Sequence, residues 1–312
     1  MEHLIHQEPS DERPRLTRWL VGVAAGLILI LPSAFLYSRN SSRQHSAQTE
    51  PFNTVEAFLK NSYARDFKKA YRYISAGDRQ LKAERVYVRE KGSFSGFPLA
   101  VTRKLAEFIE LQPLESSRQR DDRVRVKVAA KYPDANSLSA ILLDWDEERL
   151  NALPSSMQRD ILSTLDRMHR AGEIKTIQGE EEFNLVKEGT HWRVYLDWAA
   201  GIRVSYNAIV PPTDSIEAVP VNKSTTIRPS ELFTIAYRVK NRTAQTISTR
   251  ITHLIEPKEL SHHLEIIDCA LLLPVELRPG EESEFSTTYI VDGDLPEGVK
   301  ELNVTYEFQV AH

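Results

Sequence analysis

The sequence Phe233-Thr-Ile-Ala-Tyr-Arg-Val-Lys-Asn-Arg-Thr-Ala-Gln-Thr-Ile-Ser-Thr-Arg-Ile-Thr-His-Leu-Ile255 contains two strand-length runs, Phe233 to Asn241 and Thr246 to Ile255, separated by a short polar turn. Further runs of similar length follow Trp198, broken by Pro, Gly and Asn: Ile202 to Val210, Ser224 to Ile227, Glu265 to Leu273, Glu284 to Asp292 and Leu302 to Phe308. Short strands at this spacing are typical of an all-β sandwich. Residues 200–312 are therefore predicted to form an immunoglobulin-like sandwich domain.

The residues before this sandwich are predicted to form an α+β domain over 51–199. Apolar residues recur at helical spacing in Phe52 to Leu59, Phe67 to Ile74, Phe97 to Ile109 and Leu150 to His169. Strands are predicted over Val124 to Val128, Ile174 to Val186 and His191 to Trp198. Helices followed by long antiparallel strands resemble, in layout, the nuclear-transport-factor-two-like (SnoaL-type) cone domains. That resemblance implies a cone fold, which hosts both enzymes and inert binding modules.

An uncharged stretch from Trp19 to Ser38 is long enough to cross about 30 Å of hydrocarbon as a helix. Trp19 and Tyr37 stand at its two ends, where interfacial aromatic residues are expected. Arginines are denser before the stretch than after it, which favours a cytoplasmic N-terminus. The sequence thus predicts a cytoplasmic segment (1–18), a span in inner-membrane lipid (19–38), a linker (39–50) and a periplasmic or equivalent outer location for the rest. The alternative is a signal peptide cleaved near Ala34.

Length and composition set broad limits. A chain of 312 residues suggests about two domains of roughly 150 residues each. The net charge of -4, with both signs mixed, argues against a general nucleic-acid binder. The only cysteine, Cys269, has no partner for an internal disulfide, so it is available for a metal, an intermolecular bridge or packing.

A series of short motifs runs in order through the predicted sandwich: Pro220, Ile227-Arg-Pro-Ser-Glu231, Ala236-Tyr-Arg-Val-Lys-Asn241, Pro257, Leu277-Arg-Pro-Gly-Glu281, Tyr289-Ile-Val-Asp292 and Val304-Thr-Tyr-Glu-Phe308. Their order and spacing resemble those of the CtaG-type cytochrome c oxidase assembly proteins. That family is membrane-anchored and delivers copper to the binuclear centre of the oxidase. For residues 200–312, the resemblance implies a non-enzymatic assembly factor with oxidase subunits as partners and Cu(I) as its metal.

The departures from this family fall on the copper motif. The family's Cys-Phe-Cys-Phe aligns with Cys269-Ala-Leu-Leu272, so Leu271 replaces the second cysteine. Cu(I) prefers soft thiolates, commonly two of them. The missing ligand would come from Cys269 of a second protomer in a homodimer, or from His262 and His263. The competing interpretation makes Cys269 a small core hydrophobe, because strand alternation places it on the same face as Leu271 and Leu273.

Motifs for catalysis are missing from the sequence. It contains no Gly-rich phosphate loop, His-Glu-x-x-His, Gly-x-Ser-x-Gly or Cys-x-x-Cys. An acid–base site in a cone would need a base in an apolar cup facing a phenol or acid. Polar residues of the right type in the α+β domain are Tyr63, Asp66, Tyr71, Tyr73, Asp144, Asp146 and His169. Ordinary positions at core edges, in turns or at helix ends explain each of them, so we predict that the chain is not an enzyme.

Two functions are predicted. The first is a membrane-anchored assembly factor related to oxidase copper delivery, acting through protein contacts. The alternative is a ligand-binding or scaffold module of the outer compartment that uses no metal.

Overall fold

The computed structural model describes residues 45–210, 216–293, 295–296 and 298–311. The predicted cytoplasmic segment (1–18) and membrane span (19–38) lie outside these residues. Within the described part of the chain, no helix is both long and apolar enough to cross a membrane. The predicted linker (39–50) is wrong at its end, because helix α2 already begins at His45.

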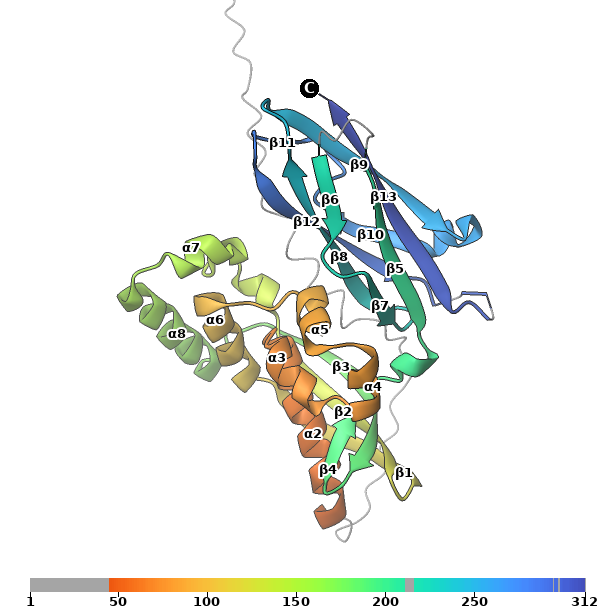
Figure 1. Ribbon diagram of the computed structural model, residues 1–312. Coiled ribbons are helices and arrows are strands. Elements are labelled where there is room, and N and C mark those ends of the chain that lie inside the picture. The colour runs from red at the N-terminus through yellow and green to blue at the C-terminus, as the bar shows by residue number, and fades with distance from the viewer. Residues whose placement is uncertain (1–44, 211–215, 294, 297, 312) are drawn as a thin grey trace, which may run out of the picture.

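The N-terminal region, defined here as residues 45–200, packs helices against a four-stranded antiparallel sheet (Figure 1). Its helices are α2 (His45–Tyr63), α3 (Phe67–Ala70), α4 (Ala76–Leu81), α5 (Glu84–Lys91), α6 (Gly96–Glu107), α7 (Glu147–Asn151) and α8 (Ser155–Arg170), with short 3-10 turns η1 (Tyr71–Tyr73), η2 (Ala135–Leu138), η3 (Leu143–Trp145) and η4 (Trp198–Ala200). Its strands, in spatial order, are β1 (Glu110–Arg120), β2 (Arg123–Pro133), β3 (Thr176–Glu188) and β4 (His191–Val194).

Alternation along β2 separates a buried face from a charged one. Val124, Val126 and Val128 pack against Val55 and Leu59 of α2 in one apolar cluster. The basic residues between these valines pair with glutamates on β3, as Lys127 Nζ and Glu180 Oε2 do at 2.6 Å. The basic face of this strand is therefore ordinary solvated surface, because its charges are paired within the sheet.

The sandwich, defined here as residues 202–311, contains two sheets. Their spatial orders are β10-β12-β8-β6 and β11-β9-β13-β5-β7. The strands are β5 (Ile202–Ile209), β6 (Ile216–Pro220), β7 (Ser224–Ile227), β8 (Leu232–Asn241), β9 (Ile247–Glu256), β10 (Leu264–Cys269), β11 (Val275–Leu277), β12 (Glu282–Val291) and β13 (Glu301–Ala311), and turn η5 (Lys258–His263) precedes β10. One apolar core lies between the sheets, where Phe233 and Tyr289 of the first sheet meet Val204 and Tyr306 of the second.

The β-rich character predicted for the C-terminal part is thus confirmed, and helices do accompany the first sheet. The cone-type and immunoglobulin-like assignments stay predictions.

Three predicted element boundaries are wrong. The helix predicted over 150–169 is divided into α7 and α8 at Pro154, which lacks an amide hydrogen and disfavours helix before it. The strand predicted from His191 ends at Val194, because the chain then turns toward the sandwich through Trp198. The strand predicted over 265–273 ends at Cys269, because the chain crosses to β11 in the opposite sheet, and Leu273 is 68% exposed.

The two regions meet through close contacts. Figure 1 shows α5 beneath the sandwich, next to β8. At the junction, the Gly201 amide donates to the Trp198 carbonyl at 2.9 Å. A Cβ at position 201 would overlap the carbonyl oxygen of Ile227, so the chain passes here only as glycine. The indole of Trp198 is buried between the regions.

Candidate functional site

Cys269 lies opposite a histidine of the other sheet. Its Sγ is 3.7 Å from Nε2 of His253, which projects from β9 into the core. The hydroxyl of Thr287 donates a hydrogen bond to the same sulfur at 3.0 Å. The thiol is 5% exposed and belongs to the sandwich core, as the packing interpretation predicts. A thiol and an imidazole therefore face one another across the two sheets.

The hydrogen bonds around His253 select one tautomer of its ring. Tyr289 uses its single hydroxyl hydrogen to donate to Tyr306 at 3.0 Å. In the short hydrogen bond between Nδ1 of His253 and the Tyr289 oxygen, the hydrogen must then come from the imidazole. Nε2 is left without a hydrogen, and its lone pair faces Cys269. Such an anchored Nδ1–H is the usual support of a metal-binding histidine.

Burial also keeps this ring neutral. Desolvation lowers the pKa of His253 to about 4, so the imidazole is uncharged at neutral pH. Ligand atoms about 2.3 Å (sulfur) and about 2.0 Å (nitrogen) from a tetrahedral ion are roughly 3.5 Å apart. Two such ligands on opposite sides of an ion would be about 4.3 Å apart. The observed Sγ–Nε2 separation of 3.7 Å lies between the two values and corresponds to a bent arrangement of two ligands. The pair has the donor chemistry and spacing for one soft metal ion.

The histidines predicted from the sequence are elsewhere. His262 and His263 belong to turn η5, at the opposite end of β10 from Cys269. Their rings lie 4.0 Å apart, and Nδ1 of His263 is 4.0 Å from a carboxylate oxygen of Asp292. The structure therefore does not bring either histidine to the thiol. Leu271, at the position of the missing cysteine, is fully buried.

The sequence did contain a signal for His253. In the run from Thr246 to Ile255, alternation places His253 on the same face as Ile251 and Ile255, which pack in the core. A histidine on the apolar face of a strand indicates a hydrogen-bonded or ligating side chain. Its proximity to Cys269 depends on how the two sheets face each other. Within the described residues, no group of three or more His, Cys, Asp or Glu side chains could hold a metal.

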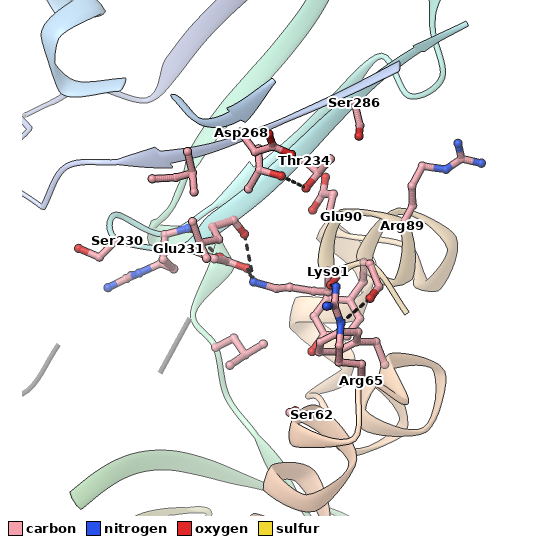
Figure 2. Close-up of a pocket in the computed structure, with 18 of the residues that line it drawn as sticks. Ser62, Arg65, Arg89, Glu90, Lys91, Ser230, Glu231, Thr234, Asp268 and Ser286 are labelled. Carbon is pink, nitrogen blue, oxygen red and sulfur yellow. Dashed lines mark hydrogen bonds and ion pairs between the residues drawn. The ribbon is translucent and has the colours of Figure 1, made fainter. Parts of the chain in front are cut away.

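A cavity of about 1070 Å³ separates the N-terminal region from the sandwich, and Cys269 is one of its lining residues. Figure 2 shows the helical side of this cavity facing the sandwich strands, with Arg65, Arg89, Glu90 and Lys91 opposite Ser230, Glu231, Thr234, Asp268 and Ser286. The cavity therefore lies between the two regions, and Cys269 borders it on the sandwich side.

A buried carboxylate ties the two regions together. Oε1 of Glu231, from the sandwich, lies 3.0 Å from Nζ of Lys91 and 3.6 Å from Nζ of Lys82, both on the helical side. Its other oxygen accepts hydrogen bonds from the Trp198 indole at 3.2 Å and the Arg228 amide at 3.1 Å. Burial alone would raise the pKa of Glu231, but Lys91 and Lys82, with the Arg228 amide, hold it at about 2.

Lys82 also pairs with Glu90 at 3.0 Å, and both side chains are fully buried. Burial raises the pKa of Glu90 despite the nearby ammonium group. The Lys82 ammonium lies over the Trp198 ring, 4.5 Å from its centroid. Together with the partly exposed Glu231 and Lys91, these residues form a charge cluster that spans both regions.

A second group of polar residues lines the same cavity within the N-terminal region. The hydroxyl of Tyr132 donates a short hydrogen bond to Oε1 of Glu181. Burial raises the pKa of both groups. The ring of Tyr63 stacks on Tyr132 at a centroid distance of 5.9 Å, and its hydroxyl donates to the Pro133 carbonyl at 2.7 Å. A desolvated carboxyl and a phenol thus lie side by side in an aromatic cup.

Of the residues that the sequence offered as acid–base candidates, only Tyr63 belongs to this group. Asp66 forms an ion pair with Arg103 at 2.6 Å. The other candidates have structural positions: the Tyr71 hydroxyl donates to the Lys82 carbonyl, Tyr73 packs on an apolar cluster, Asp144 lies in turn η3, Asp146 caps α7, and His169 stacks on Phe108. Sequence reasoning missed Glu181, although alternation in β3 places it on the same face as Phe183 and Leu185.

Comparisons with known proteins concern the C-terminal part of the chain. Residues 173–309 match the profile of the family described as cytochrome c oxidase assembly protein CtaG/Cox11. Cytochrome c oxidase assembly protein CtaG of Rhizobium meliloti is 28% identical over 112 residues, which are 34% of this chain and 57% of that protein. The protein of the same name from Sinorhizobium fredii is 25% identical over 112 residues, 34% of this chain and 56% of its own.

The CtaG-type resemblance predicted from the motifs is therefore confirmed for this segment, and the matched profile extends back into β3. The chain covers just over half the length of the curated relatives it matches. Among solved structures, Escherichia coli alpha-2-macroglobulin activated by porcine elastase is 10% identical, with a TM-score of 0.22, over 65% of this chain and 21% of that one. A likeness at this level supports no argument.

Proposed function

We propose that this chain is a membrane-anchored, non-enzymatic assembly factor of the cytochrome c oxidase type, and that its sandwich carries one Cu(I) ion as cargo at Cys269 and His253. The observation that supports this most directly is the distance of 3.7 Å between Nε2 of His253 and the Cys269 sulfur. The family match of residues 173–309 supports the biological setting.

The proposed site differs from the family's pair of cysteines in its second ligand. A neutral imidazole takes the place of the second thiolate, and both ligands come from strands that the sandwich core holds in place. Cu(I) is satisfied by two soft or borderline donors in such a dry site. The thiol loses its proton when the ion binds, and Thr287 keeps a hydrogen bond to the sulfur.

The remaining parts of the proposal come from the sequence. Residues 19–38 anchor the chain in the inner membrane, and the region described here lies in the periplasm or an equivalent outer compartment. The cone-type and immunoglobulin-like folds, the oxidase subunits as partners and a homodimer belong to the same proposal. In a homodimer, a second Cys269 would replace or supplement the imidazole.

The ligand-binding alternative is favoured by a separate observation, the cavity of about 1070 Å³ between the regions. That volume suits a small molecule, and such a role is compatible with an assembly factor.

Competition titration of Cu(I) against a chelator of known affinity tests the copper proposal on the full-length chain in mild detergent. We expect Cys269→Ser and His253→Gln each to weaken binding at least tenfold. His262→Gln serves as the matched control, because that ring is solvent-exposed in turn η5, and it should leave the affinity unchanged. Equal affinity of the unmodified chain and Cys269→Ser would overturn the proposal.

Affinity purification from membranes tests the cellular role. Oxidase subunits should be retained by the unmodified chain under conditions where an unrelated membrane protein retains none. Their absence would favour the ligand-binding alternative.

A further inference from the structure

The cavity contains a partly buried, desolvated carboxylate that lacks a cationic partner. Glu181 accepts a hydrogen bond from Tyr132, and in the part of the chain that the structure describes it has no ion pair with a lysine, arginine or histidine. Its neighbours in sequence differ, since Glu180 pairs with Lys127 and Glu182 with Arg125 on the outer face of the sheet. Glu181 points to the opposite, apolar face.

Three other acids around the cavity are neutralised. Glu231 and Glu90 pair with lysines, and Glu284 pairs with Arg89 at 2.6 Å. Asp268 is partly exposed on the sandwich wall, where water can reach it. A desolvated carboxylate without a cation is unfavourable unless a ligand supplies the charge or the group takes up a proton.

The walls next to Glu181 are aromatic. Tyr63 and Tyr132 stack with an interplanar angle of 11°, and Phe58 meets Phe183 edge to face at 6.2 Å. All four side chains line the cavity. Aromatic faces attract organic cations, and the attraction strengthens where water is excluded.

The hydrogen bonds within the protein determine which donors and acceptors near Glu181 remain available to a ligand. The Tyr63 hydroxyl donates its hydrogen to the Pro133 carbonyl, and the Tyr132 hydroxyl donates its hydrogen to Glu181. The Glu181 carboxylate retains free acceptor positions and has no hydrogen to give. A ligand at this place must therefore present a hydrogen-bond donor, and a positive charge suits it best.

We propose that this cavity binds an organic amine, with the ammonium group at Glu181 and the apolar body against the aromatic walls. Small arylalkyl or alkyl ammonium ions fit this site, because the cavity of about 1070 Å³ is slightly larger than the usual range for small-molecule sites, roughly 300–1,000 Å³. This inference is independent of copper, since neither Cys269 nor His253 contributes to the ammonium position.

Calorimetry on the full-length chain tests it with matched probes of one shape: 2-phenylethylammonium, the neutral 2-phenylethanol and the anionic 3-phenylpropanoate. Hexylammonium and tryptammonium extend the test to amines with a different apolar group. We expect at least one ammonium ion to bind, and 2-phenylethylammonium to bind at least tenfold more tightly than the alcohol. Glu181→Gln should abolish that preference, whereas Glu180→Gln, on the outer face of the same strand, should preserve it.

A second variant keeps the test valid if Glu181→Gln alters folding. Tyr132→Phe removes only the hydroxyl that orients Glu181, and it should reduce ammonium binding about threefold to tenfold while the alcohol changes little. Three results would overturn the proposal: no ammonium probe binds, the alcohol binds as tightly as its ammonium counterpart, or Glu181→Gln retains the preference in a folded protein. Tighter binding of the alcohol would show that Glu181 is protonated and that the site takes neutral donors.

Discussion

Nε2 of His253 and Sγ of Cys269 face each other at 3.7 Å, although the two residues belong to different sheets of the sandwich. The imidazole is fixed from behind by Tyr289, and the sulfur by Thr287. This relationship gives the lone cysteine a nearby nitrogen donor. It also explains why a chain without the second family cysteine can still offer two ligands.

The buried imidazole should make stability depend on pH. The folded pKa of His253, about 4, lies below the unfolded value of 6.5, so the unfolded state binds the proton first as pH falls. Stability from this ring is complete above pH 6.5 and is lost as pH falls toward 4. We expect a loss of about 1–2 kcal/mol, allowing for partial contact of the ring with solvent.

Urea unfolding at pH 7 and pH 5 measures this loss. In His253→Gln, the change in the free energy of unfolding between pH 7 and pH 5 should shrink by that amount. In His262→Gln, it should equal that of the unmodified chain. An unchanged pH dependence in His253→Gln would contradict the assigned role of burial.

Restoring the missing cysteine should strengthen copper binding. Leu271 is fully buried in the same core as Cys269, so Leu271→Cys adds a second thiol where the family motif has one. We expect Cu(I) affinity to rise at least tenfold in the chelator competition, at a stability cost of about 1–3 kcal/mol for the lost side-chain volume. Leu271→Ala creates a similar void without the thiol and should show the stability loss alone. A Leu271→Cys chain with unchanged affinity would mean that residues 269 and 271 cannot reach one ion.

The charge cluster around Glu231 should hold the two regions together. Glu231→Gln leaves Lys91 and the buried Lys82 with less compensation, and we expect a loss of about 2–4 kcal/mol in the free energy of unfolding. Glu284→Gln is the matched control, because it breaks an exposed inter-region pair with Arg89 and should lose about 1 kcal/mol or less.

Denaturant unfolding compares the two variants. Because the folded pKa of Glu231 is about 2, its contribution is present above the unfolded value near 4.5 and disappears as pH falls toward 2. If both variants lost the same free energy of unfolding at pH 7, the ion pairs of Glu231 would be no more stabilising than an exposed pair.

The junction glycine should tolerate no side chain. A methyl group at Gly201 overlaps the Ile227 carbonyl oxygen and approaches the Trp198 carbonyl oxygen to 2.9 Å. Gly201→Ala should therefore destabilise the protein by about 1–3 kcal/mol. Gly77→Ala, in helix α4, has its nearest neighbour atom at 4.0 Å and should be neutral or stabilising by up to about 1 kcal/mol. Differential scanning calorimetry of both variants checks the contrast, and a Gly201→Ala midpoint equal to that of Gly77→Ala would contradict it.

Much of the strand pattern could be predicted because alternation and turn residues are local. The run from Ser224 to Ile227 is strand β7 as predicted, and the separate helical runs predicted from Phe52 and from Phe67 correspond to α2 and α3. Strands β1, β6 and β11 were missed. Strand β1 is mostly exposed and lacks an apolar alternation. Errors at Pro154 and after Cys269 arose where the chain changes direction to meet a distant partner.

The candidate site was predictable only in part. The family spacing identified Cys269, but proximity in sequence suggested His262 and His263 as its neighbours. The nitrogen that faces the sulfur belongs to a strand sixteen residues earlier in the chain. Glu181 was overlooked for a related reason. Alternation in β3 places it on the face of Phe183 and Leu185, but only the packing of distant elements makes that face an aromatic cup.

The sequence by itself determined most of the helices and strands, the CtaG-type character of the C-terminal segment, and the single thiol at Cys269. Tertiary structure decided the rest: which histidine meets the thiol, which partly buried carboxylate lacks a cation, and where the cavity between the two regions lies. The physical reason is that periodicity and turn chemistry act over a few residues, whereas ligand pairs and desolvation depend on which faces of distant strands pack together.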